Sequence, residues 1–107
     1  MSLKALGLVL LVGLAGCAEP GSTGTGHPGK TTYQRYCFSC HASGVAGAPR
    51  SGDVEAWAGR IVKGKAELLR TTIAGIPPGM PPKGLCAACT DEQLEAAIDY
   101  MIDAATR

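Results

Sequence analysis

The chain has 107 residues, a length that favours one small domain. Its formal net charge at pH 7 is +1, and aromatic residues make up 5% of it. A charge this close to zero gives no reason to expect a groove for nucleic acid or a strongly basic patch for membranes.

The first sixteen residues are typical of an export signal. Residues 1–4 carry a single positive charge, and the ten residues 5–14 that follow are apolar. An apolar run of this length is too short to span a bilayer, which takes roughly 20 helical residues. We therefore predict that residues 1–16 are a signal peptide.

Residues 14–17 (LAGC) resemble the lipobox of bacterial lipoproteins, in which the signal is cut before a cysteine that carries lipid. Cys17 would then be the first residue of the mature chain and its membrane anchor. Cysteine counting favours this, because Cys17 is left over once the two Cys-x-x-Cys pairs are set aside, and a free thiol is a liability in an oxidising compartment. The alternative is an ordinary signal cut after Ala18, which would leave a soluble periplasmic protein.

Residues 17–28 are expected to form the lipid-anchored cysteine and a flexible tether, because they are rich in Gly and Pro and lack periodic apolar positions. A flexible chain of this length reaches about 20 Å. His27 is expected to be solvated within it. The folded domain is then predicted at residues 29–107, where a core made of side chains alone is marginal.

Helical periodicity recurs along this domain, whereas no run of residues alternates with the period of two that strands require. We predict an all-α domain of four short helices joined by Gly- and Pro-rich loops, at about residues 28–40, 54–62, 66–74 and 90–102. So little regular structure cannot close a core alone. Another apolar group is expected to supply part of the core volume.

Sequence signals mark the ends of these helices. Asp53 is placed as an N-cap, and the positions behind it that are expected to face the core are Val54, Trp57, Ala58, Ile61 and Val62. Residues 90–93 (TDEQ) fit a capping box, and the apolar face that follows consists of Leu94, Ala97, Ile98, Met101 and Ile102. The third helix is expected to stop at Gly75.

Residues 37–41 (CFSCH) carry the C-x-x-C-H pattern that marks attachment of a c-type haem. Two thiols three residues apart on a helical turn project on one side, where Cys37 and Cys40 can each add to a vinyl group. The next residue, His41, then places an imidazole over the iron as an axial ligand. We predict one covalently attached haem c.

A second Cys-x-x-Cys pair, Cys86 and Cys89, has no His after it and is not expected to hold another haem. Its thiols are expected to form a disulfide at the start of the last helix. A zinc ribbon is an alternative, but 45 residues separate Cys40 from Cys86, whereas zinc pairs lie roughly 15 to 20 residues apart. A thioredoxin-like dithiol would need a βαβ pattern, which is missing.

Met80 is the candidate for the sixth iron ligand. It lies in the loop of residues 75–84, where four prolines restrict φ and prevent a helix. Such a rigid loop can lay a thioether over a flat macrocycle at little entropic cost. The alternatives are a methionine that only fills a gap in the core, and His27 as the ligand.

Taken together, these features resemble cytochrome c5, a small bacterial class I cytochrome c. The resemblance rests on the C-x-x-C-H run, residues 44–53 (GVAGAPRSGD), Trp57 with Arg60, residues 80–84 (MPPKG) and the cysteine pair beside that loop. It covers nearly all of residues 29–105. It implies the class I fold, with about four short helices around one haem, and the lipobox is a departure from the simplest soluble form.

The resemblance also implies roles for single residues near the haem. The carbonyl of Pro49 would accept the ring N–H of His41, which fixes the tautomer of the imidazole. Trp57 and Arg60 would point at a haem propionate and supply a hydrogen bond and a positive charge. The alternative for these two is a core tryptophan beside a solvated arginine.

Other residues are placed around the edges of this site. Gly29 and Tyr33 would pack the first helix against the last one, near Ala97 and Tyr100. Three lysines would edge the exposed haem rim and orient partners, unless they are only solvated surface: Lys63, Lys65 and Lys83.

With both axial positions filled, no open site remains for oxygen or substrate. We therefore expect a monomeric one-electron carrier of the bacterial periplasm, not an enzyme, which meets redox proteins in small transient contacts and reaches the membrane through lipid on Cys17. A thioether ligand raises the reduction potential. The alternatives are a ligand-binding or sensing haem protein with a displaceable sixth ligand, and an electron-entry subunit of a larger redox enzyme.

Overall fold

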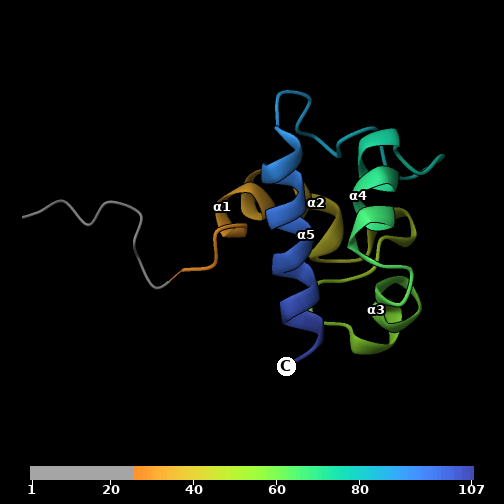
Figure 1. The fold of residues 1–107 in the computed structure, drawn as a ribbon. Coiled ribbons are helices and arrows are strands. Elements are labelled where there is room, and N and C mark those ends of the chain that lie inside the picture. The colour runs from red at the N-terminus through yellow and green to blue at the C-terminus, as the bar shows by residue number, and fades with distance from the viewer. Residues whose placement is uncertain (1–25) are drawn as a thin grey trace, which may run out of the picture.

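The computed structural model describes residues 26–107, and in this part of the chain the regular elements are helical apart from one isolated bridge (Figure 1). In chain order they are α1 (Lys30–Thr32), the π turn η1 (Tyr33–Cys37), α2 (Phe38–His41), the 3-10 turn η2 (Val45–Gly47), α3 (Val54–Ile61), α4 (Lys65–Ala74) and α5 (Asp91–Ala105). The predicted signal peptide, Cys17 and most of the tether lie outside the described residues. Among the described residues, no helix has the length and apolar character needed to cross a membrane.

The prediction of four short helices is confirmed, since α1, η1 and α2 follow one another as a single helical segment. This segment starts at Lys30, with Gly29 as its N-cap, and not at Pro28. The π turn in its middle has no signal in the sequence. It adds a residue to one turn, and the same segment directs Tyr33 toward α5 and His41 toward Trp57 of α3.

The two predicted N-caps are present. The carboxylate of Asp53 accepts the backbone N–H of Ala56 at 3.0 Å and caps α3. At the start of α5, Thr90 and Gln93 form a reciprocal capping box, with hydrogen bonds of 3.2 and 2.9 Å. Because each side chain satisfies a backbone N–H that has no partner inside the helix, both starts are fixed locally.

The prediction for the buried face of α3 is wrong at three of its five positions. Trp57 is buried and Ile61 packs against the same cluster, but Val54, Ala58 and Val62 face solvent, Val62 with 84% of its surface exposed. The helix contacts α4 and α5 along a narrow seam, so only one edge of its apolar stripe is covered. Helical periodicity indicates which residues form the apolar stripe, but it does not indicate how much of the stripe other helices cover.

Helix α5 runs through the middle of the domain, with α1 to one side and α3 and α4 to the other (Figure 1). The predicted contact between the first and last helices is confirmed: the rings of Tyr33 and Tyr100 lie 4.9 Å apart, between centroids. Gly29 lies so close to α5 that a Cβ atom there would collide with the backbone carbonyl of Ala96. The absence of a side chain at Gly29 therefore sets the distance between these helices.

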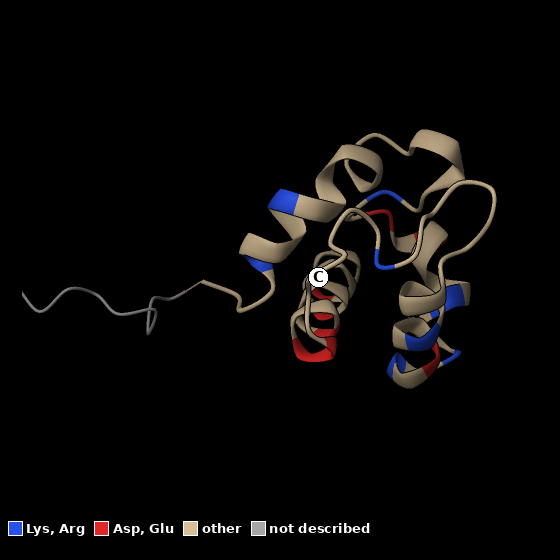
Figure 2. Cartoon of the chain, turned by 90° about the horizontal axis from the view of Figure 1, so that it is seen from above, with Lys and Arg blue, Asp and Glu red and all other residues tan. Residues whose placement is uncertain are grey.

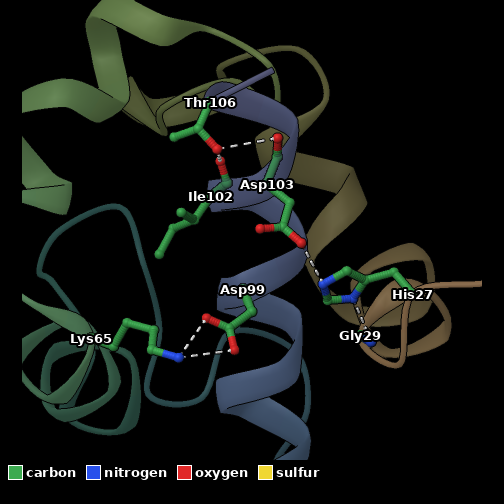
Figure 3. Close-up of polar contacts among 7 residues, drawn as sticks. All are labelled: His27, Gly29, Lys65, Asp99, Ile102, Asp103 and Thr106. Atoms are coloured by element: carbon green, nitrogen blue, oxygen red, sulfur yellow. Dashed lines mark hydrogen bonds and ion pairs between the residues drawn. The ribbon is translucent and has the colours of Figure 1, made fainter.

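His27 packs against the domain, contrary to the expectation that it is solvated (Figure 3). Its Nε2 lies 2.9 Å from the carboxylate of Asp103, its Nδ1 accepts the backbone N–H of Gly29 at 3.0 Å, and its ring meets Tyr100 edge-on. Only 19% of its side chain is exposed. The folded unit therefore includes at least two residues that the sequence assigned to the tether.

The charged side chains are unevenly distributed over the described residues, although the net charge is close to zero. Figure 2 shows acidic residues concentrated on α5, while lysines and arginines are spread over the other elements. One basic side chain is drawn toward this helix, since the Nζ of Lys65 lies 3.2 Å from a carboxylate oxygen of Asp99 (Figure 3). Lys65 is thus engaged in an exposed ion pair.

Replacing Gly29 by Ala should lower the free energy of unfolding by about 2 to 3 kcal/mol, because the new methyl group pushes α1 away from the backbone of α5. Denaturant unfolding of the purified protein measures this. Gly59→Ala is the matched control, since Gly59 lies inside α3 with open space around it. That change should stabilise by about 0.5 to 1 kcal/mol, and equal losses at both sites would contradict the packing described for Gly29.

Candidate functional site

A cavity of about 230 Å³ lies between the helices, and it brings together residues from both ends of the domain. Its walls include both C-x-x-C-H thiols and the imidazole on one part and Met80 on another. The remaining wall is mainly apolar, and the contributions from α4 and α5 include Leu68, Thr72, Leu94, Ile98 and Met101. Residues that are far apart in the sequence thus line one cavity.

His41 is held rigidly in the wall of this cavity. It is 8% exposed, and its Nδ1 lies 2.8 Å from the carbonyl oxygen of Pro49. Because a carbonyl only accepts, Nδ1 carries the hydrogen and Nε2 keeps its lone pair. The backbone carbonyl of His41 in turn accepts the N–H of Ser51 at 2.6 Å. The loop after η2 therefore fixes the ring and the backbone of this residue together.

Cys37 and Cys40 are free thiols on the helical segment next to His41, and both line the cavity. Burial raises the pKa of the Cys37 thiol to about 11, and the nearby Cys40 adds to the rise. The thiol of Cys37 is therefore neutral at pH 7, as expected beside an apolar cavity.

The loop that carries Met80 is closed on itself by two backbone hydrogen bonds. The N–H of Ile76 donates to the carbonyl of Met80 at 2.8 Å, and the N–H of Met80 donates to the carbonyl of Ile76 at 2.9 Å. A Cβ atom on Gly79 would lie 2.9 Å from the carbonyl oxygen of Ala46, so η2 supports the loop closely. Ala46 has a φ of 54°, and nothing in the sequence marked it as part of this support.

Trp57 and Arg60 both line the cavity, and each donates a hydrogen bond to a backbone carbonyl of the protein. The indole N–H of Trp57 donates to the carbonyl oxygen of Arg50 at 2.9 Å, and the guanidinium of Arg60 donates to the carbonyl of Ala56. The partner of the indole was missed by sequence reasoning. Every residue has a backbone carbonyl, so the residue type at position 50 gives no signal that Arg50 is the acceptor.

Cys86 and Cys89 form a disulfide just before α5. Both residues are 5% exposed and pack with Leu94. Their sulfurs are bonded to each other and are not free to bind zinc, and residues 26–107 contain no group of three or more His, Cys, Asp or Glu arranged to hold a metal. The zinc alternative therefore loses its second pair of ligands.

The residues of the cavity fit a covalently bound haem. Apolar side chains suit a macrocycle, two thiols stand ready for thioether bonds, and His41 presents Nε2 as a free nitrogen. An all-α domain with C-x-x-C-H on the wall of such a cavity defines the class of c-type cytochromes.

Comparison with known proteins points the same way. Residues 24–101 match the family described as cytochrome c oxidase, cbb3-type, subunit III. Cytochrome c5 of Azotobacter vinelandii is 41% identical over 80 residues, which cover 73% of this chain and 95% of that protein. Cytochrome c-555 of Chlorobaculum tepidum is 43% identical over 77 residues, covering 69% of this chain and 71% of that protein.

A solved structure is also similar in space. It is described as the crystal structure of an electron transfer complex of nitrite reductase with cytochrome c. The TM-score is 0.68 and the sequence identity 45%, and the match covers 73% of this chain and 94% of that one. The chain therefore belongs to the monohaem class I cytochromes c, the family of cytochrome c5 and cytochrome c-555. It is an electron carrier and not an enzyme, and its cofactor is haem c.

Trp57→Phe should lower the free energy of unfolding by about 0.5 to 1.5 kcal/mol, because it removes the indole hydrogen bond to the carbonyl of Arg50, which then accepts only from the N–H of Asp53. Denaturant unfolding of the haem-loaded protein measures the loss. Arg50→Ala is the control, since the backbone acceptor survives the change. A shift in reduction potential without loss of stability would show instead that the indole donates to the haem.

Proposed function

We propose that this cytochrome is a one-electron carrier of the bacterial periplasm in which His41 and Met80 are the two axial ligands of the haem iron. The observation that carries the proposal is that both side chains lie on the walls of one cavity, each held by its own loop. Haem c supplies a reversible one-electron couple at the iron. Cys37 and Cys40 are proposed to hold its porphyrin through thioether bonds.

The chemistry of this ligand pair suits electron transfer. A neutral imidazole and a thioether stabilise ferrous iron and raise the reduction potential. The Pro49 carbonyl orients His41, and the Ile76 bridge restrains Met80, so neither ligand needs to move when the charge on the iron changes. A fixed pair also leaves no open position, so an exogenous ligand has to displace Met80.

The partners are proposed to be other redox proteins, met by a monomer in small contacts. The similar cytochrome c in complex with nitrite reductase supports this class of partner. Three exposed apolar residues, Val45, Ile76 and Leu85, border the cavity and offer an uncharged contact surface. Roles of Trp57 and Arg60 at the propionates remain part of this proposal; the indole N–H of Trp57 would have to leave its present partner, whereas the guanidinium of Arg60 has further N–H groups.

Met80→Ala should abolish the weak red-edge absorption that the oxidised protein owes to sulfur bound to iron, because no other sulfur replaces it. The visible spectrum of the purified oxidised protein measures this. Met101→Leu is the matched control: Met101 lines the same cavity but is buried in the core on α5, and its loss should leave the band unchanged.

Survival of the band in Met80→Ala would contradict the assignment of the sixth ligand. Carbon monoxide separates the electron carrier from the sensor alternative. A firmly bound Met80 predicts little spectral change when the gas is added to the reduced protein, whereas a displaceable ligand predicts an immediate one.

The domain is further proposed to be a lipoprotein, with residues 1–16 as its signal, lipid on Cys17, and a tether over residues 17–28 leading to the haem domain. Cys17→Ser should move the protein from the membrane fraction to the soluble periplasmic fraction, because the lipidated residue is lost. Fractionation followed by haem staining measures the change. Ser22→Ala, a change of similar size in the tether, should leave the protein in the membrane fraction, and unchanged fractionation of Cys17→Ser would contradict the lipobox.

A further inference from the structure

Lys83 lies near the end of the Met80 loop, residues 75–84, and its side chain turns inward. Its ammonium donates to the backbone carbonyl of Cys89 at 3.4 Å, and the residue is half-buried and lines the cavity. The sequence had grouped it with Lys63 as a surface lysine that orients partners. Lys63 is exposed, so the two lysines have different surroundings.

The backbone of Lys83 is tied on both sides. Its N–H donates to the carbonyl of Thr72 in α4 at 2.7 Å, and its carbonyl accepts the N–H of Cys86 at 3.1 Å. Its φ of 59° is left-handed, a conformation that residues other than glycine rarely adopt. The contacts to α4 and to the disulfide ring hold it in this conformation.

The chain between Met80 and Lys83 has little conformational freedom. The two residues between them are Pro81 and Pro82, whose rings fix φ. The N–H of Gly84 donates back to the carbonyl of Pro81 at 2.9 Å, which closes a turn around Lys83. The chain that joins Lys83 to Met80 therefore has few free dihedral angles.

We propose that Lys83 is a positioning residue that ties the Met80 loop to α4 and to the Cys86–Cys89 ring. In this arrangement the integrity of the disulfide sets how firmly Met80 is held in the cavity. The ring has this effect because it fixes the Cys89 carbonyl that accepts the lysine and the Cys86 N–H that holds the lysine backbone. The inference rests on the proposed role of Met80 as an iron ligand.

The test is the rate at which carbon monoxide binds the reduced, haem-loaded protein, since the gas has to displace Met80. Lys83→Met keeps the length of the side chain and removes the donor, and should speed binding by about fivefold, the equivalent of one modest hydrogen bond. Lys83→Arg keeps a donor and should restore much of the slow binding. Lys63→Met removes the same charge at an exposed site and should leave the rate unchanged.

The ring is tested by replacing both of its cysteines, Cys86→Ala with Cys89→Ala. This variant should also bind carbon monoxide faster, and adding Lys83→Met to it should change the rate little, because the acceptor of the lysine is no longer fixed. Such non-additivity is expected of groups that act through one contact. Should the double cysteine variant fail to fold, the three lysine variants still decide whether Lys83 positions Met80, and the rate in the unmodified protein with its disulfide reduced tests the ring.

Three results would overturn the inference. The first is an unchanged rate in Lys83→Met, and the second is an equal change in Lys63→Met, which would indicate a general effect of charge. The third is full additivity of the lysine and ring changes. If the unmodified protein lacks the sulfur-to-iron absorption, the ligand role of Met80 fails and this inference with it, whereas a normal band with an unchanged rate in Lys83→Met removes the lysine role alone.

Discussion

The structure is organised around an apolar cavity that no single element encloses. The buried side chains form two separate clusters, one around Tyr33, Trp57 and Met101 and another around Leu94 and the disulfide. Helix α4 contributes to the cavity wall, yet has no fully buried residue. With five aromatic residues, the chain has few large side chains that could fill this cavity. When bound, haem c would supply an apolar surface for these walls, so cofactor binding would complete the core.

His41 and Met80 are each held in the wall of this cavity, but by different kinds of contact. The imidazole of His41 is oriented by a side-chain hydrogen bond to the loop at Pro49. The segment around Met80 is oriented by its own backbone, through the bridge to Ile76 and the close approach of Gly79 to η2. A preorganised site of this kind suits a carrier, because exchange of an electron then requires little rearrangement of the protein.

Local sequence signals predicted the helices well, because a cap or a helix stop depends on neighbours within a few residues. Asp53, the Thr90 capping box and the stop at Gly75 all appear where the sequence placed them. The errors occurred where a distant segment decides the outcome. The valines of α3 stay exposed because no element covers them, and His27 is recruited to the domain by a carboxylate 76 positions away on α5.

The sequence by itself determined the class of cofactor, since two thiols and an imidazole at fixed spacing are a local chemical fact. It also determined the all-α fold through helical periodicity, and it identified Met80 as a candidate ligand because four prolines exclude a helix around that residue. Only the tertiary structure decided which partners the other polar groups take. The indole of Trp57 bonds to a backbone carbonyl, and the ammonium of Lys83 turns toward Cys89. Such acceptors are main-chain atoms brought close by folding, and residue type does not reveal them.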